Sequence, residues 1–201
     1  MSTVICPGSF DPITKGHLDI IVRASKLFSR VIVLVSKNPQ KTTSFSEQER
    51  VEMIRAVTGD LPGVEVDCYH GLLADYARQV GAIAVVKGLR AVSDFEYEFQ
   101  QSLANKKLNP ELETIFLNTN SKYMYLSSSI VKQIAAFGGD IADFVPPAIV
   151  QPIKVAVLIV LVSIAMMLLE NVIGVKMYLT SCIGAAALVL TGVLTDRKSV
   201  V

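Results

Sequence analysis

The chain has 201 residues, with 19 basic and 18 acidic side chains, and its net charge is +1. This balance excludes the strong positive field of nucleic-acid-binding proteins, so no nucleic-acid partner is expected. The three cysteines, Cys6, Cys68 and Cys182, have neither zinc-ligand spacing nor the even number of a disulfide framework, so we expect buried, reduced thiols.

The first element is a short apolar strand over residues 4–6, and a turn and a helical pattern over residues 16–28 follow it. The turn ends in Thr14-Lys15-Gly16-His17. The first backbone N–H groups of a helix lack partners, and the helix dipole attracts an anion there. His17 in the first turn would lie close to a bound phosphate, which suggests nucleotide chemistry. The alternative is a helix cap or a surface histidine.

Strands and helices alternate through the first 140 residues. Further strands are predicted at 31–35, 64–68, 82–87 and 114–117, and further helices at 47–58, 72–79, 94–108 and 128–137. Ser46 and Glu49 form a capping box before the second helix. Five short β-branched strands separated by helices favour an α/β fold, a Rossmann-like five-stranded parallel sheet with helices on both faces. Ligands bind beyond the carboxyl ends of such strands, where His17 and Lys87 fall.

The sequence changes character near residue 151, and we divide the chain into domains at 1–151 and 152–201. Prolines 146, 147 and 152 break the helical pattern, and the stretches 155–169 and 177–194 are uncharged. The second stretch has the length of a membrane-spanning helix, and the first approaches it when extended. We therefore expect a C-terminal two-helix hydrophobic hairpin, membrane-embedded and in contact with lipid or detergent. The alternative is a helix pair buried within a protein assembly.

Three motifs, in matching order and spacing, resemble those of a known family. They lie at residues 7–17, 87–98 and 126–132. The first resembles the T/HxGH signature of the nucleotidyltransferase superfamily, and the three together resemble phosphopantetheine adenylyltransferase. The resemblance covers roughly residues 1–150. It implies transfer of the adenylyl group of ATP to 4′-phosphopantetheine, which gives dephospho-coenzyme A and pyrophosphate in coenzyme A biosynthesis.

The resemblance also implies roles for single residues. His17 would be catalytic, contacting the α-phosphate and stabilising the transition state. The substrate-binding residues for 4′-phosphopantetheine would be Ser9, Lys41, Leu73 and Lys87. The ATP-binding residues would be Ser9, Phe10, Thr14, His17, Gly88, Leu89, Arg90, Glu98, Tyr123, Met124, Tyr125, Leu126, Ser127, Ser128 and Ser129. Lys87 stands where many members carry arginine, so it keeps the charge without the bidentate fork.

Several of these residues also have a purely structural interpretation. Lys41 can be a solvated loop lysine, Leu73 a core residue and Glu98 an ion-pair partner on a helix surface. The serines 127–129 can form only a helix N-cap cluster. His70 has no motif around it and is interpreted as a surface residue.

The reaction implied by the resemblance needs positioning and charge stabilisation, because the acceptor phosphate is already ionised. The sequence has no Ser-His-Asp set and no paired-carboxylate site with an obvious partner. It has no dedicated metal cage either, so Mg²⁺ is expected to arrive bound to ATP. The resemblance further implies a homohexamer through the N-terminal domain. No secretory signal precedes the first strand, so we expect a cytoplasmic enzyme domain.

The last fifty residues are foreign to that family. Residues 184–195 resemble a transmembrane hairpin of divalent-anion/sodium symporters. A rival hypothesis is therefore a chimera in which the N-terminal domain is a soluble oligomeric carrier for a membrane-protein segment. Transport by the hairpin alone is disfavoured, because two helices without a charged or broken intramembrane site do not form a transporter.

Overall fold

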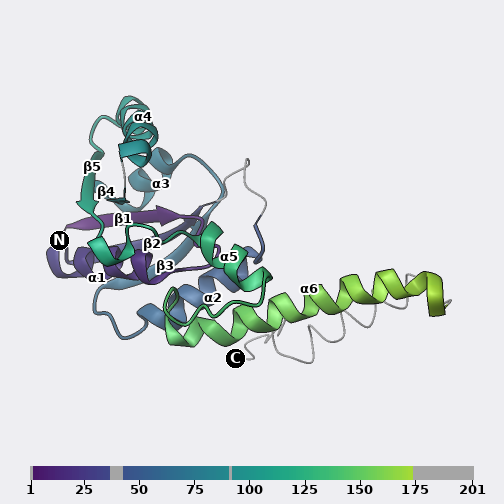
Figure 1. The fold of residues 1–201 in the computed structure, drawn as a ribbon. Coiled ribbons are helices and arrows are strands. Elements are labelled where there is room, and N and C mark those ends of the chain that lie inside the picture. Colours follow the sequence, from purple (N-terminus) through teal and green to yellow (C-terminus); the bar gives the residue numbers. More distant parts are fainter. Residues whose placement is uncertain (1, 37–42, 91, 174–201) are drawn as a thin grey trace, which may run out of the picture.

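The computed structural model describes residues 2–36, 43–90 and 92–173, and strands and helices alternate along them (Figure 1). The elements in chain order are β1 (Thr3–Gly8), α1 (Lys15–Leu27), β2 (Arg30–Ser36), α2 (Glu47–Thr58), β3 (Val64–Tyr69), α3 (Leu73–Val80), β4 (Ala84–Leu89), α4 (Val92–Leu108), β5 (Glu113–Asn118), the short 3₁₀ helix η1 (Ser121–Tyr123), α5 (Ser128–Ala136) and α6 (Pro147–Ile173). Every strand and helix expected in the first 140 residues is present.

The five strands form one parallel sheet, as the sequence predicted. Their order in the sheet is β3-β2-β1-β4-β5. β1 is central, and Val4 pairs with Val31 on one side and Ala84 on the other. Because all strands run the same way, the carboxyl ends of β1 and β4 meet at one edge of the sheet. The β1–α1 turn and the Lys87 motif therefore lie next to each other.

Helices cover both faces of the sheet, which accounts for two hydrophobic clusters. Neighbouring residues of a strand point to opposite faces. Val4 belongs to a cluster with buried residues of α1, α2, α5 and α6, whereas Ile5 packs with Tyr76 of α3 in a second cluster. The expectation of a sheet covered on both faces is thereby confirmed.

The cysteines differ from one another in burial. Cys6 on β1 is buried, as expected, but Cys68 on β3 is exposed, so that expectation is wrong. The reason is that β3 is an edge strand, with a neighbouring strand on one side alone. Cys182 lies outside the described residues.

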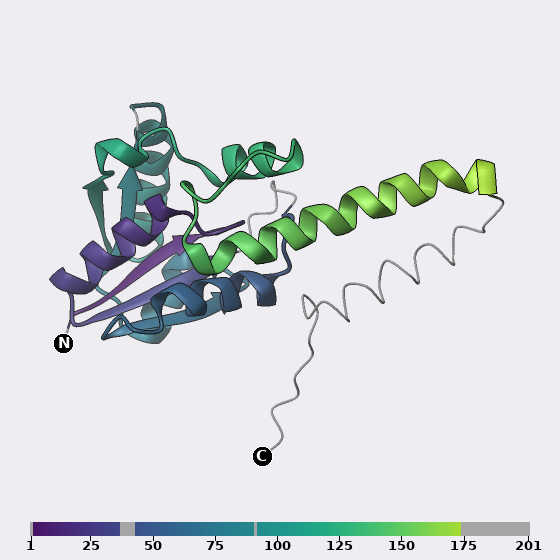
Figure 2. The same cartoon turned by 60° about the horizontal axis from the view of Figure 1, so that its bottom comes forward.

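The helix α6 runs through the position where the sequence analysis placed a break. Pro147 is its first residue, where the missing N–H of proline is tolerated, and Pro152 lies inside the helix. Ile149 and Ile153 are almost completely buried against the main core, and this packing offsets the cost of the internal proline. Beyond these turns, α6 extends away from the sheet (Figure 2).

The C-terminal hairpin is only partly covered by the structure. Within residues 2–36, 43–90 and 92–173, no helix has the length and apolar character that crossing a membrane requires. The second predicted helix, residues 177–194, lies outside the described residues, so the hairpin stays a prediction.

Candidate active site

The turn between β1 and α1 has an unusual backbone. Phe10 has a φ of 45°, in the left-handed region, and the Asp11–Pro12 peptide bond is cis. A Cβ at Gly8 would lie 3.0 Å from the Phe10 ring, so glycine allows this ring to fold back over the end of β1. Non-glycine residues adopt such a φ only when surrounding contacts hold them. Phe10 is buried, which places a rigid aromatic wall at the end of the strand.

Thr14 and His17 cap the start of α1 reciprocally. The Thr14 Oγ1 accepts the His17 N–H at 3.3 Å, and the His17 Nδ1 accepts the Thr14 N–H at 3.1 Å. Because Nδ1 accepts a hydrogen bond, we assign the proton of the neutral ring to Nε2. The ring also packs edge-on to Phe10, with centroids 5.2 Å apart. The first turn thus holds His17 in one orientation and one tautomer.

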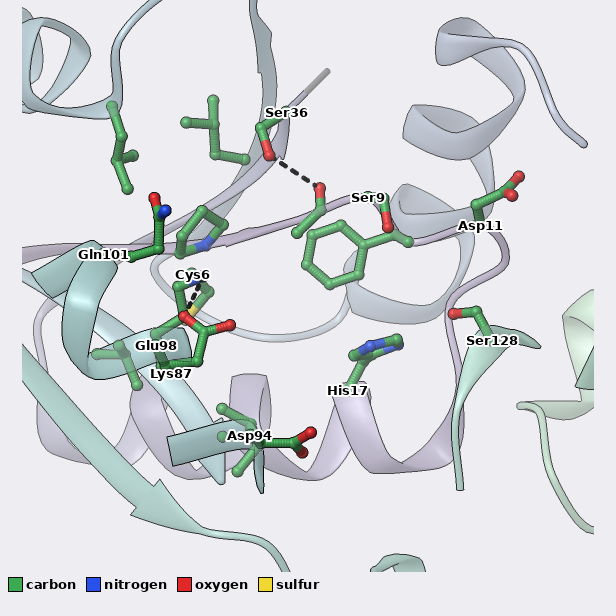
Figure 3. Close-up of a pocket in the computed structure, with 18 of the residues that line it drawn as sticks. Cys6, Ser9, Asp11, His17, Ser36, Lys87, Asp94, Glu98, Gln101 and Ser128 are labelled. Carbon is green, nitrogen blue, oxygen red and sulfur yellow. Dashed lines mark hydrogen bonds and ion pairs between the residues drawn. The ribbon is translucent and has the colours of Figure 1, made fainter. Parts of the chain in front are cut away.

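Two cationic side chains lie at the carboxyl end of β4, Lys87 within the strand and Arg90 just after it, and each is held by a carboxylate of α4. The Lys87 Nζ lies 3.0 Å from Glu98 Oε2, an ion pair drawn in Figure 3. The Arg90 Nε donates to Asp94 Oδ2 at 2.9 Å. The Arg90 Nη1 also donates to the Leu126 carbonyl at 2.9 Å, which ties this loop to the segment before α5. Phosphate oxygens could replace these carboxylates on both cations.

The start of α5 lies against the β1–α1 turn. Ser127 is the N-cap residue, and its side chain accepts the Ile130 N–H at 3.2 Å. The Ser128 Oγ donates to the Pro12 carbonyl at 2.8 Å. The structural interpretation of the serines is therefore correct for Ser127, while the helix start also borders the same space as His17.

An open cavity of about 1340 Å³ lies at this edge of the sheet. Most residues assigned to the site by resemblance line it, namely Ser9, Phe10, Thr14, His17, Leu73, Lys87, Gly88, Arg90, Glu98, Tyr123, Leu126, Ser127, Ser128 and Ser129. Leu89, Met124 and Tyr125 do not line it, and Met124 and Tyr125 are exposed. Lys41 lies outside the described residues. The structure thus gathers side chains from three distant motifs.

The cavity wall includes residues that the sequence analysis did not select. Asp11 and Lys132 line it and belong to two of the three motifs. Asp94 also lines it, in the first turn of α4 and four residues after Arg90 of the preceding loop. That spacing is an ion-pair signal that could have identified Asp94. His70, interpreted as a surface residue, is exposed as expected, but it also borders the cavity and pairs with Glu47 at 2.9 Å.

Cys6 contributes its thiol to the cavity wall, but it is no nucleophile. Burial raises the pKa of Cys6 to about 12, and the nearby Lys87 charge opposes this only in part. The thiol therefore stays protonated near neutral pH, and the thiolate is the reactive form. Among the described residues, no three or more His, Cys, Asp or Glu side chains are grouped to hold a metal ion.

Comparison with known proteins identifies the family. Residues 5–134 match the family model described as cytidylyltransferase-like. The chain is 58% identical over 151 residues to the phosphopantetheine adenylyltransferase of Caldanaerobacter subterraneus subsp. tengcongensis, a match that covers 75% of this chain and 94% of that protein. The chain belongs to the phosphopantetheine adenylyltransferase family.

A second family member, from Alkaliphilus metalliredigens, is 57% identical over 151 residues, which cover 75% of this chain and 96% of that protein. Among solved structures, a putative nicotinate-nucleotide adenylyltransferase from Vibrio parahaemolyticus superposes with a TM-score of 0.57 at 17% identity, over 78% of this chain and 95% of that one. That likeness shows the shared fold. The resemblance read from the three motifs is confirmed, whereas these matches do not show the symporter resemblance of residues 184–195.

Proposed function

We propose that this protein transfers the adenylyl group of ATP to 4′-phosphopantetheine and releases pyrophosphate. The observation that supports it most directly is that His17, Lys87 and Arg90 line one cavity. The first turns of α1 and α5 border the same cavity. Helix starts and cations together favour a highly charged phosphate ligand. Membership in the phosphopantetheine adenylyltransferase family then supports the choice of substrates.

The proposed chemistry is an in-line displacement at the α-phosphorus of ATP. An oxygen of the acceptor phosphate forms the new P–O bond, and the bond to the pyrophosphate oxygen breaks. The acceptor is already an anion, so no base is needed. The His17 Nε2–H donates to an α-phosphate oxygen, whose charge grows in the transition state. Mg²⁺, delivered with ATP, would neutralise charge on the departing pyrophosphate.

The two substrates would occupy different parts of the cavity. Lys87 would exchange its ion pair with Glu98 for one with the acceptor phosphate, and Lys41 would bind the same phosphate. Leu73, the first residue of α3, lines another part of the cavity wall. An apolar side chain there suits a pantetheine arm. Arg90 would bind the triphosphate next to the start of α5, because its guanidinium already contacts the Leu126 carbonyl.

The proposed reaction can be tested by a direct assay of the purified full chain with ATP, Mg²⁺ and 4′-phosphopantetheine. Formation of dephospho-coenzyme A and pyrophosphate in equal amounts is expected. Nicotinate mononucleotide serves as the competing acceptor, because the fold is shared with a putative nicotinate-nucleotide adenylyltransferase. Preference for the mononucleotide would overturn the substrate assignment. A folded chain that is inactive with both acceptors would favour the carrier hypothesis instead.

We also propose that the N-terminal domain assembles as a homohexamer in the cytoplasm. An apolar stripe on α4 supports self-association. Phe95, Phe99 and Leu103 recur every four residues, and these residues are 41%, 44% and 56% exposed. Exposed apolar residues at this spacing line one side of a helix and favour burial against a partner. Native mass measurement of the purified protein tests the assembly, and a stable monomer would contradict it.

We further propose that the chain beyond Ile153 is an apolar attachment that takes no part in the chemistry. Leu158, Val160, Leu161 and Val162 on the projecting part of α6 are about half exposed or more. The compared relatives also leave a quarter of this chain unmatched. Cell fractionation of chains with and without residues 154–201 tests whether this segment holds the protein at a membrane. A full chain in the soluble fraction without detergent would remove the membrane hypothesis.

A further inference from the structure

Asp11 is a buried carboxylate in the turn that carries the active-site motif. Only 5% of its side chain is exposed. An isolated buried charge is strongly unfavourable, so its partners define what the residue does. Figure 3 shows the Asp11 carboxylate pointing away from the His17 ring. The side chain therefore serves the surrounding framework and not the cavity centre.

One oxygen of Asp11 holds the segment that leads into α2. Oδ1 accepts the N–H groups of Ser44 at 3.0 Å and Phe45 at 2.9 Å, and Oδ2 shares the Ser44 N–H at 3.1 Å. Phe45 is buried in the main core, so these bonds fix the start of this segment against the turn. The Arg50 Nη1, also on α2, donates to the Ser9 carbonyl at 2.7 Å and braces the same turn from the same side.

The other oxygen of Asp11 holds α5. Oδ2 lies 2.6 Å from the Lys132 Nζ, and the Lys132 side chain is 30% exposed. Lys132 lies one helical turn after Ser128, which itself donates to the Pro12 carbonyl. The carboxylate therefore joins the segment before α2 to α5. Oδ1 accepts only from the former, whereas Oδ2 contacts Lys132 of the latter and shares the Ser44 N–H.

We propose that Asp11 is a positioning residue that couples the α2 side of the cavity to α5 through its two carboxylate oxygens. The inference rests on the proposed function, in which α5 borders the ATP phosphates and the segment before α2 borders the acceptor. In-line transfer requires the two substrates to be aligned, and an error of about 1 Å can cost about 100-fold in rate. The bridge sets that alignment without contacting either substrate.

Asp11→Asn tests the bridge selectively. The amide oxygen can still accept from Ser44 and Phe45, whereas the amide nitrogen would face the Lys132 ammonium and cannot accept from it. We expect kcat to fall about 10- to 100-fold, with both KM values changed less than about threefold. Asp75→Asn, in an exposed pair with Arg78, is the matched control and should stay within about twofold in kcat.

Lys132 variants separate positioning from direct phosphate binding. Lys132→Met should lower kcat as Asp11→Asn does, and Lys132→Arg, which keeps the charge, should restore most of it. The double variant should be no slower than Lys132→Met alone, because both changes break one interaction. If Asp11→Asn keeps the full kcat while Lys132→Met loses it, Lys132 acts on substrate directly and the bridge hypothesis is wrong.

Hydrogen exchange gives a readout that does not depend on turnover. In Asp11→Asn, amides at the start of α5 should exchange faster, while those of residues 43–46 keep their protection. In Asp11→Ala both segments should exchange faster. Unchanged exchange at α5 in Asp11→Asn would overturn the coupling. If the variants show these exchange changes but the wild-type chain catalyses no adenylyl transfer, the proposed reaction is refuted and the bridge still stands.

Discussion

His17 shows how a single side chain can be both a helix cap and a reactive group. Its backbone N–H and its Nδ1 satisfy the start of α1, and the tautomer that this requires carries its proton on Nε2. Glutamate commonly occupies this position of a capping box. Here the imidazole replaces it, so the fold itself selects the tautomer.

His17→Ala should lower kcat by about 10²–10³-fold, since one donor to a developing charge is lost. The helix keeps the Thr14 cap, so the unfolding temperature should change little. Steady-state kinetics and thermal unfolding measure the two effects. Lys26→Ala, an exposed change in the last turn of the same helix, is the control. Unchanged turnover in His17→Ala would remove this residue from the mechanism.

Lys87 and Arg90 should separate the two substrates. Lys87→Ala, and Lys41→Ala by resemblance, should raise the KM for the acceptor by about tenfold or more, and Arg90→Ala should do the same for ATP. The reason is that each cation would pair with a different phosphate group. Initial-rate measurements with each substrate varied give both constants. Equal losses for both substrates in every variant would contradict the assignment of two subsites.

Because the Cys6 thiol is buried, the protein should lose stability at alkaline pH. Its pKa in the folded state is raised from 9.0 to about 12, so the unfolded chain releases this proton first. The contribution of the neutral thiol is complete below pH 9 and is lost as the pH rises toward 12. Chemical unfolding between pH 8 and pH 11 should show a shallower decline for Cys6→Ala than for the wild type. Identical slopes would show that other groups govern the decline.

At the scale of elements, sequence patterns predicted the contacts between residues that are close together in the chain. The capping box of Ser46 and Glu49 is present, with both reciprocal hydrogen bonds, because its residues are three positions apart. The contact between Asp11 and Lys132 joins residues 121 positions apart, and no local pattern encodes it. The break expected at Pro152 did not occur, because Ile153 is buried in the core and holds the helix there. That burial could not be inferred from the helical pattern alone.

The position of α6 predicts where the chain can be shortened. A chain ending after Ile153 keeps both buried isoleucines of the docked turns, whereas one ending after Gln151 loses Ile153. Removal of that side chain should lower the free energy of unfolding by about 2–3 kcal/mol. Urea unfolding of the two chains measures the difference. Equal stabilities would show that the docked turn contributes nothing.

At the scale of the whole molecule, the fold and most of the site could be predicted, but self-association depends on surfaces. The sheet order brings the three motifs together, and this follows from parallel strands and short connections. The exposed stripe on α4 could not be inferred from the sequence, because apolar residues at helical spacing usually indicate a core-facing side. Exposure of Phe95, Phe99 and Leu103 becomes visible only once the remaining elements are placed.

Phe99→Glu should therefore weaken assembly. A carboxylate in an apolar contact must be desolvated without a partner, which is strongly unfavourable. Sedimentation should show smaller species for Phe99→Glu than for the wild type. Lys107→Glu, which introduces the same carboxylate on another position of α4, is the control. An intact assembly in Phe99→Glu would place the interface elsewhere.

The paired cations of the cavity also have a consequence for selectivity. Lys87 and Arg90 are already neutralised by Glu98 and Asp94. A small inorganic anion would replace one ion pair with another at each cation, so its binding would gain little free energy. The acceptor phosphate would displace Glu98 from Lys87, the triphosphate would displace Asp94 from Arg90, and both would also gain from the helix starts. The site would therefore stay open to its substrates in a cell rich in chloride and free phosphate.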